Sequence, residues 1–189
     1  MHPPGRNGSD PINSYALVTY LPEPVGTYFD IVRRELEPDA PLARSHVTLL
    51  PPRPVTALDA ACEHLRDLLP SVAPISVDTG EVVVFPVTSV IYVSITAGTE
   101  DLIRAHRLLN SGPLAQVEAF DYCPHITLAQ SIPRERIDEA VRVAQRRWAD
   151  YRGPRRFLAT SFTFVQNTTD NRWVDLESIS SSRRVASLK

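Results

Sequence analysis

The chain has 189 residues, enough for one domain or two small lobes, and its hydrophobic content of 43% is sufficient for a buried core. Its apolar runs fall short of the roughly 18 residues that cross a membrane, and its polar start does not resemble a signal peptide, so we expect a cytoplasmic protein without a membrane partner. The two cysteines, Cys62 and Cys123, lack the spacing of a zinc site or a disulfide framework, and we expect neither a metal nor another cofactor.

The formal net charge is −2. The basic residues are unusual, since Lys189 is the only lysine and the other Lys/Arg positions are all arginine. Arginine is better suited than lysine to bidentate phosphate binding. Residues 134–156 hold eight arginines and four acids, a local surplus that fits either a path for nucleic acid or a solvated helix face.

The first half of the chain alternates short apolar runs with helical periodicity, after an expected loose tail over residues 1–13. In order, the pattern predicts a strand at 15–21, a helix at 25–36, a strand at 46–50, a stiff proline turn at 51–54, a helix capped by Thr56 that runs to 69, and strands at 75–84 and 90–96 joined by a hairpin.

The second half repeats this plan, with residues 92–97 in the place of the first strand. It predicts a helix at 101–110, an ambiguous segment at 114–122, a strand at 125–128, a helix from 133 to 148, and closing strands at 157–166 and 172–178. Residues 180–189 are expected to fray, so the folded domain is expected to span residues 14–179.

Two short stretches of similar sequence carry the chemistry: Ser45-His46-Val47-Thr48-Leu49 and Cys123-Pro124-His125-Ile126-Thr127-Leu128. Each places His-x-Thr in a β-branched apolar run that is typical of a strand. Because alternate side chains of a strand share a face, each motif presents an imidazole and a hydroxyl together, roughly 6.6 Å apart at their Cα atoms. A phosphate group can bridge that span.

The similarity extends beyond the motifs, at a constant shift of 79 residues. The matched pairs are Pro54 with Pro133, Leu58 with Ile137, Asp59 with Asp138, Ala61 with Ala140 and Phe85 with Phe164. We interpret the shift as an internal duplication about an approximate two-fold axis. The predicted fold class is α+β and bilobal, with two mostly antiparallel sheets, helices on their outer faces and a central cleft between the two motifs.

The pair of histidines suits in-line cleavage of a phosphodiester, in which one group takes a proton from the attacking hydroxyl and another gives one to the leaving oxygen. His46 and His125 fit these roles, while Thr48 and Thr127 would hold the phosphate oxygens. The alternative is that both histidines are satisfied in a core and the threonines only fill strands. Neither motif has a third ligand nearby for a metal.

At these residues the sequence resembles the 2H phosphoesterase superfamily, which includes the 2'-5' RNA ligases, also called RNA 2',3'-cyclic phosphodiesterases. The family is defined by two His-x-Thr/Ser motifs, here at His46 and His125. The resemblance implies a bilobal fold around a cleft and metal-independent hydrolysis of a 2',3'-cyclic phosphate on RNA or a nucleotide, commonly leaving a 2'-phosphate. In the reverse direction it implies 2'-5' joining of RNA ends.

Four neighbouring residues are candidates for substrate contact. Arg53 could reach a phosphate or lie in a solvent-facing turn, Phe85 and Phe164 could stack on a base or pack in the core, and Tyr122 could border the cleft. A nucleotide- or RNA-binding module without turnover remains the non-enzymatic alternative. We expect a monomer whose partner is RNA or a nucleotide with a cyclic phosphate; which histidine is the acid is left open.

Overall fold

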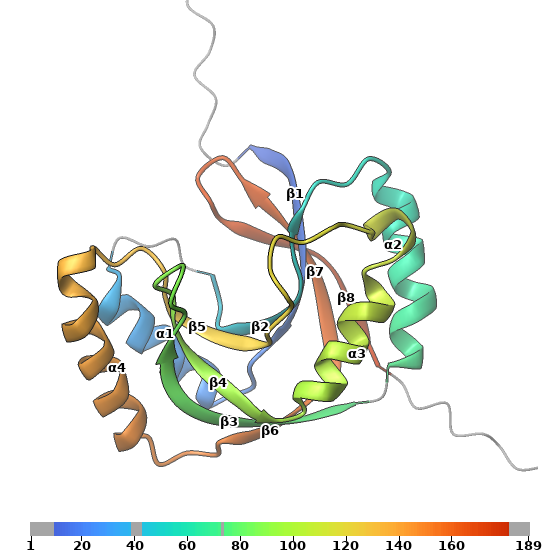
Figure 1. The fold of residues 1–189 in the computed structure, drawn as a ribbon. Coiled ribbons are helices and arrows are strands. Elements are labelled where there is room, and N and C mark those ends of the chain that lie inside the picture. The colour runs from blue at the N-terminus through green and yellow to red at the C-terminus, as the bar shows by residue number, and fades with distance from the viewer. Residues whose placement is uncertain (1–9, 39–42, 73, 182–189) are drawn as a thin grey trace, which may run out of the picture.

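The structure is a computed structural model that describes residues 10–38, 43–72 and 74–181 (Figure 1). Its strands are β1 (Pro11–Tyr20), β2 (His46–Arg53), β3 (Ile75–Val84), β4 (Ile91–Ala97), β5 (His125–Ala129), β6 (Arg156–Ala159), β7 (Ser161–Thr168) and β8 (Trp173–Ser180). Its α-helices are α1 (Val25–Leu36), α2 (Leu58–Leu68), α3 (Thr99–Leu109) and α4 (Ile137–Asp150). The α+β class predicted from the sequence is therefore confirmed.

The strands form one antiparallel sheet of eight strands, in the order β6-β3-β4-β5-β2-β1-β7-β8. The expectation of two separate sheets was wrong. The two motif strands, β2 and β5, are neighbours in the middle of this sheet, where Val47 pairs with Ile126. Hydrogen bonds between them join what the sequence pattern suggested were separate sheets.

The sheet is strongly curled, and its connectivity explains why. Strand β6 lies at one edge, β7 lies next to the opposite edge, and only Thr160 separates them in the chain. One residue spans at most about 3.6 Å, so the two edges have to approach each other. The backbone N–H of Ser181 at the end of β8 donates to the Thr160 carbonyl at 2.8 Å, which fixes this corner.

The order of strands is similar on the two sides of the β2/β5 pair. Outward from β2 the sheet continues with β1 and β7, and outward from β5 it continues with β4 and β3. Val47 and Ile126, which pair at the centre, are also related by the shift of 79 residues. This arrangement is compatible with a duplication, which stays a prediction.

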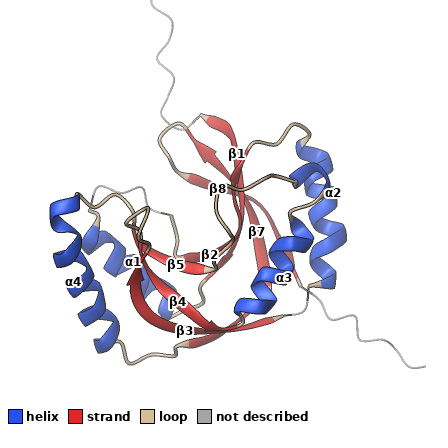
Figure 2. Cartoon of the chain, in the orientation of Figure 1, coloured by secondary structure: helices blue, strands red, loops and turns tan. Residues whose placement is uncertain are grey.

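The helices pack on one face of the curled sheet in two pairs, α1 with α4 and α2 with α3 (Figure 2). Their apolar faces and the inward residues of the sheet form one core, which includes Phe29, Leu65, Leu102 and Trp148. Within the described ranges, no helix is both long enough and apolar enough to span a bilayer.

Several predicted boundaries differ from the structure. Strand β2 continues through Pro51 and Pro52 to Arg53, where we expected a turn, because beyond Leu50 only β1 pairs with it and the missing proline N–H groups cost no ladder bond on the other side. Helix α2 is capped by Ala57 without a side-chain bond, so the Thr56 cap was wrong.

The closing strand expected at 157–166 is two strands, β6 and β7, that belong to opposite parts of the sheet. Residues 11–13, which we assigned to a tail, belong to β1, and β8 reaches Ser180. The rest of the expected tails, residues 1–9 and 182–189, lies outside the described residues.

We predict that Ile126→Ala lowers the free energy of unfolding by about 2–5 kcal/mol, because Ile126 is fully buried at the one register pair that joins the motif strands. Urea unfolding measures this change. Val117→Ala is the matched control, since its side chain is 97% exposed, and we expect it to change stability by less than about 0.5 kcal/mol. Equal effects of the two substitutions would contradict the central role of the β2/β5 pair.

Candidate active site

The two motifs lie on facing positions of paired strands. Val47 and Ile126 are fully buried in the core, whereas the histidine and threonine of each motif are half-buried on the opposite face, as strand alternation predicts. With Val47 opposite Ile126 in an antiparallel pair, His46 comes opposite Thr127 and Thr48 opposite His125. The two histidines therefore occupy diagonal positions, which lie roughly 7–8 Å apart in such a pair.

His46, Thr48, His125 and Thr127 all line one cavity with a volume of about 1080 Å³. Its walls also include the end of β1, the β3–β4 turn around residues 85–90, the loop at 116–123 and the β7–β8 hairpin. Among the described residues, no group of three or more His, Cys, Asp or Glu side chains is arranged to hold a metal ion.

A backbone carbonyl fixes each imidazole in the same way. The Nδ1 atom of His46 lies 2.6 Å from the Arg44 carbonyl oxygen, and that of His125 lies 2.8 Å from the Cys123 carbonyl oxygen. Because a carbonyl oxygen can only accept, each Nδ1 carries the hydrogen. The Nε2 atom of each ring is therefore the one left to accept or donate a proton.

The surroundings of both rings disfavour the charged form. Burial lowers the pKa of His46 to about 4, and the nearby charges of Arg33 and His125 act in the same direction. Burial also lowers the pKa of His125. Since the charge of one ring affects the pKa of the other, the two histidines share one electrostatic environment.

Aromatic rings flank both histidines. The ring of Tyr20 stands edge-on to His46, with centroids 6.4 Å apart, and Phe85 and Tyr92 stand edge-on to His125 at 5.0 and 5.2 Å. Phe85 and Tyr92 are themselves stacked, with centroids 4.0 Å apart. These contacts limit the rotation of both imidazoles.

The four candidates for substrate contact are placed differently. Phe85 and Tyr122 line the cavity together with the motifs. Phe164, the repeat partner of Phe85, is 1% exposed and stacks on Tyr15 in the core, 5.5 Å between centroids. Arg53 is 2% exposed and does not line the cavity, so the solvent-facing turn expected for it was wrong.

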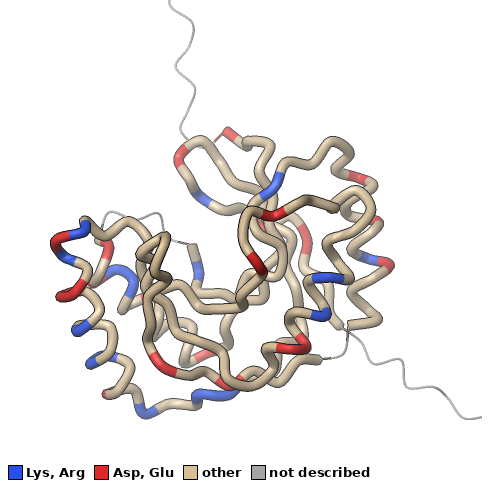
Figure 3. The backbone as a smooth tube through the Cα atoms, in the orientation of Figure 1, with Lys and Arg blue, Asp and Glu red and all other residues tan. Residues whose placement is uncertain are grey.

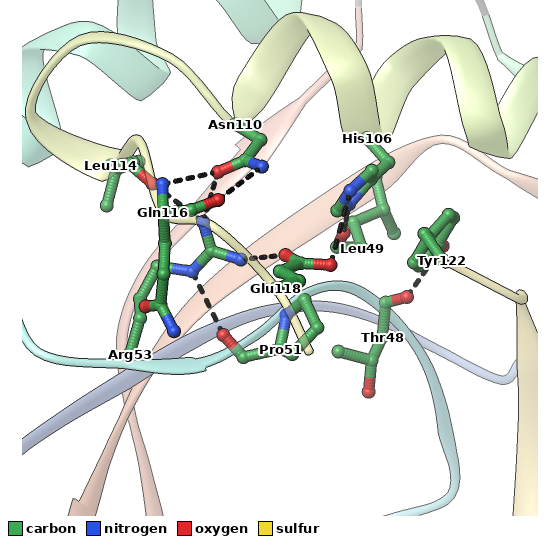
Figure 4. Close-up of polar contacts among 10 residues, drawn as sticks. All are labelled: Thr48, Leu49, Pro51, Arg53, His106, Asn110, Leu114, Gln116, Glu118 and Tyr122. Carbon is green, nitrogen blue, oxygen red and sulfur yellow. Dashed lines mark hydrogen bonds and ion pairs between the residues drawn. The ribbon is translucent and has the colours of Figure 1, made fainter. Parts of the chain in front are cut away.

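Arg53 instead anchors the loop that forms one cavity wall (Figure 4). Its guanidinium donates to the Pro51 and Leu114 carbonyls at 3.0 and 2.6 Å, to Asn110 Oδ1 at 2.8 Å and to Glu118 Oε1 at 2.6 Å. The acceptors come from β2, from the end of α3 and from the loop that follows it. The arginine therefore acts as a buried tie between the first motif strand and that loop.

His106 and Tyr122 form a second tie to β2. His106 Nδ1 donates to the Leu49 carbonyl at 2.7 Å, its ring stacks on Tyr122 with centroids 4.0 Å apart, and the Tyr122 hydroxyl donates to the Thr48 carbonyl at 2.7 Å (Figure 4). Tyr122 thus holds the backbone of the first motif, while the next residue, Cys123, holds the imidazole of the second.

The structure also brings residues to the cavity that the sequence analysis missed. They are Tyr20, Arg33, Glu37, Arg44, Trp173 and Asp175, among others. Arg44 lies two residues before His46, so its proximity to the motif was a usable signal. The others come from elements remote in sequence, and no local pattern marks them.

The arginine-rich region 134–156 does not contribute to the cavity wall. Its basic positions run along α4, which packs against α1 on the outside of the fold (Figure 3). Arg147 pairs with Glu35 and Arg156 with Asp78, and Arg155 lies over the Trp148 ring at 4.3 Å. The excess of arginines over acids in residues 134–156 therefore lies away from the two His-x-Thr motifs.

We predict a loss of stability on acidification that depends on His46. Because its folded pKa of about 4 lies below the ordinary value of 6.5, the unfolded chain takes up the proton first as the pH falls. The contribution of neutral His46 to the free energy of unfolding is complete above about pH 6.5 and is lost as the pH falls from about 6.5 to about 4. Urea unfolding at pH 7.5 and pH 5 should show His46→Gln losing less stability than the wild type, by on the order of 1 kcal/mol. An identical pH dependence in both proteins would contradict the shift.

We predict that Arg53→Met costs about 3 kcal/mol of unfolding free energy, because it leaves the Glu118 carboxylate without its buried partner. Chemical denaturation measures this. Arg104→Gln is the control, since Arg104 pairs with Asp101 at the surface and its removal should cost less than about 1 kcal/mol. A cost for Arg53→Met as small as that of the control would show that this tie does not hold the loop.

Comparison with known proteins was made on sequence and on structure. A sequence profile of the 2'-5' RNA ligase superfamily matches residues 21–171. A Bacillus licheniformis protein named "Putative phosphoesterase" is 27% identical over 121 residues, which cover 62% of this chain and 71% of the relative.

Two solved structures share the fold. E. coli LigT complexed with 3'-AMP matches with a TM-score of 0.66 at 16% identity and covers 90% of this chain and 99% of LigT. Kluyveromyces marxianus Usb1 with uridine monophosphate matches with a TM-score of 0.53 at 13% identity and covers 87% and 97% of the two chains. The profile match includes both His-x-Thr motifs and confirms the resemblance seen in the sequence. The chain belongs to the 2'-5' RNA ligase superfamily, a group of the 2H phosphoesterases.

Proposed function

We propose that the protein is a phosphodiesterase that hydrolyses 2',3'-cyclic phosphates of RNA ends or nucleotides by metal-independent acid–base catalysis. The observation that carries the proposal is that both His-x-Thr motifs line one cavity, with each Nδ1 held by a backbone carbonyl. Membership of a superfamily of phosphodiester-processing enzymes supports it.

In this mechanism the cyclic phosphate lies between the two imidazoles. The Nε2 atom of one neutral histidine takes a proton from water, and the water oxygen attacks phosphorus. The bond from phosphorus to one ribose oxygen breaks, and the protonated Nε2 of the other histidine gives its proton to that oxygen. The product is a phosphomonoester, on the 2'-oxygen as the resemblance to the family implies.

The surroundings of the two rings favour one assignment of these roles. Burial and the charges of Arg33 and His125 disfavour protonation of His46, so its ring is unprotonated and free to take a proton from water. The pKa of His125 is also lowered by burial, but no charged side chain adds to that lowering, so we propose His125 for the acid. A bound phosphate anion raises the pKa of a neighbouring imidazole and so favours protonation of His125 in the complex.

Thr48 and Thr127 complete the site. Within the described residues neither hydroxyl has a hydrogen-bond partner from the protein, and both side chains line the cavity. Two hydroxyls on either side of the phosphate can donate to its non-bridging oxygens and stabilise the charge that develops there. Phe85, half-buried beside His125, offers a face for the nucleobase.

The nucleotides in related structures support the substrate class. LigT was solved with 3'-AMP and Usb1 with uridine monophosphate, and both ligands are nucleotides with one phosphate. The name of the superfamily also favours a second candidate function, the 2'-5' joining of RNA ends. The same acid–base pair would perform it if a 5'-hydroxyl replaced water as the nucleophile.

We predict that the purified protein hydrolyses nucleoside 2',3'-cyclic phosphates in the presence of EDTA with a bell-shaped pH profile. Each of His46→Ala and His125→Ala should lower kcat at least about 100-fold, because each removes one proton-transfer group. Chromatography of the nucleoside monophosphate products measures the rate and identifies the oxygen that keeps the phosphate.

His64→Ala is the matched control, because His64 contacts Ser111 at 3.0 Å and does not line the cavity. It should retain wild-type activity. Hydrolysis that disappears with the chelator, or that survives either motif substitution, would refute the mechanism. Nucleotide-dependent thermal stabilisation without any turnover would favour the binding module instead.

A further inference from the structure

Two arginines that the proposed reaction does not use line the cavity next to the first motif. Arg33 comes from α1 and Arg44 from the segment just before β2, and within the described residues no other basic side chain besides the motif histidines belongs to the wall. Both arginines of the wall therefore come from elements next to the first motif.

Arg33 is half-buried, which makes its charge unusual. One Nη1 hydrogen is donated to the Ala43 carbonyl at 2.6 Å, and burial lowers the pKa of the guanidinium. No described carboxylate lies within ion-pair distance of it. A buried cation that faces a cavity with donors to spare is well suited to an anionic ligand.

Arg44 is held in place from two sides. Its guanidinium lies 4.0 Å above the centroid of the Tyr20 ring, and the Tyr20 hydroxyl donates to Asp175 on β8. Its own carbonyl accepts the Nδ1 hydrogen of His46 at 2.6 Å. Stacking on an aromatic face leaves the N–H groups at the edge of the guanidinium available to a phosphate.

Three of the acidic residues of the wall have hydrogen-bond partners of their own, but they keep their charge, and Glu37 together with Asp30 also acts on the Arg33 guanidinium and raises its pKa. Glu37 accepts from the backbone N–H groups of Gln130 and Ser131, Glu118 pairs with Arg53, and Asp175 accepts from Tyr20. The remaining acid, Asp121, lies in the loop before the second motif.

We propose that Arg33 and Arg44 form a subsite for a second phosphate, so that the enzyme acts on the 3' ends of RNA in preference to free cyclic mononucleotides. The inference rests on the proposed function. In an RNA that ends in a 2',3'-cyclic phosphate, the next phosphate along the chain is bonded to the 5'-oxygen of the terminal nucleoside. That 5'-phosphate is the group assigned to the two arginines.

The Tyr20 ring places the Arg44 guanidinium beside His46. The guanidinium lies 4.0 Å above the centroid of the Tyr20 ring, and that ring stands edge-on to His46 with centroids 6.4 Å apart. A volume of about 1080 Å³ exceeds that of most small-molecule pockets and leaves room for a nucleotide with both phosphates.

The test compares ligands that differ only in the 5'-phosphate. Calorimetry with adenosine 3'-monophosphate and adenosine 3',5'-bisphosphate measures binding without turnover. Hydrolysis of adenosine 2',3'-cyclic phosphate with and without a 5'-phosphate measures the effect on the reaction. We expect the 5'-phosphate to tighten binding and raise kcat/KM roughly tenfold in the wild type.

Arg44→Gln should remove most of this gain and leave the ligands without a 5'-phosphate nearly unaffected. Arg33→Gln should also remove the gain, but it should change the reaction with both cyclic substrates as well, because the Arg33 charge lowers the pKa of His46. Arg34→Gln is the matched control, because Arg34 is the exposed neighbour of Arg33 on α1 and does not line the cavity. Since Arg33 is half-buried, thermal unfolding of each variant is measured in parallel, and the exposed Arg44 alone still decides the question.

Equal binding of the two nucleotides by the wild type would overturn the proposal. An equal loss for both ligands in Arg44→Gln would also overturn it and would place the arginine at the reacting phosphate. A 5'-phosphate preference that depends on Arg44 but comes with no hydrolysis of either cyclic substrate would uphold the subsite and refute only the proposed reaction.

Discussion

The pairing of Val47 with Ile126 is the contact on which the rest of the structure depends. It joins the two motif strands at the middle of the sheet and sets which side chains face each other across them. Because strand side chains alternate, a slip of one residue would turn both histidines into the core. The burial of Val47 and Ile126 beneath the helices opposes such a slip, so packing on one face of the sheet fixes the chemistry on the other.

The cavity above these strands depends on connections that lie far apart in the chain. The curl imposed at Thr160 brings the β7–β8 hairpin over the strands, and the buried contacts of Arg53, His106 and Tyr122 hold the loop before the second motif against β2. Neither the β7–β8 hairpin nor the loop before the second motif contains a residue that transfers a proton in the proposed reaction. Both limit the positions that a substrate can take between the two imidazoles.

The sequence predicted the features that depend on local pattern. Alternation in each motif correctly placed the histidine and threonine of each strand on one face, and helical periodicity gave α1 its bounds. The features that the sequence did not predict correctly depend on residues far apart in the chain. Two sheets were expected because hydrogen bonding between β2 and β5 leaves no mark in either strand, and Phe85 and Phe164 could not be distinguished because their repeat positions are alike while their neighbours differ. Arg33 reaches the cavity only through the packing of α1 on β5, which no spacing reveals.

The link at Thr160 also bears on how the protein forms during synthesis. Strand β1 is the first strand of the sheet to be made and has β7 as a neighbour, so Leu17 finds its partner only when Phe164 has left the ribosome. Strand β3 likewise waits for β6. Contacts of such long sequence separation are slow to form. Strands β1 and β3 therefore keep unpaired edges until β6 and β7 have been translated, so the order of the strands delays the completion of the sheet until its last strands are made.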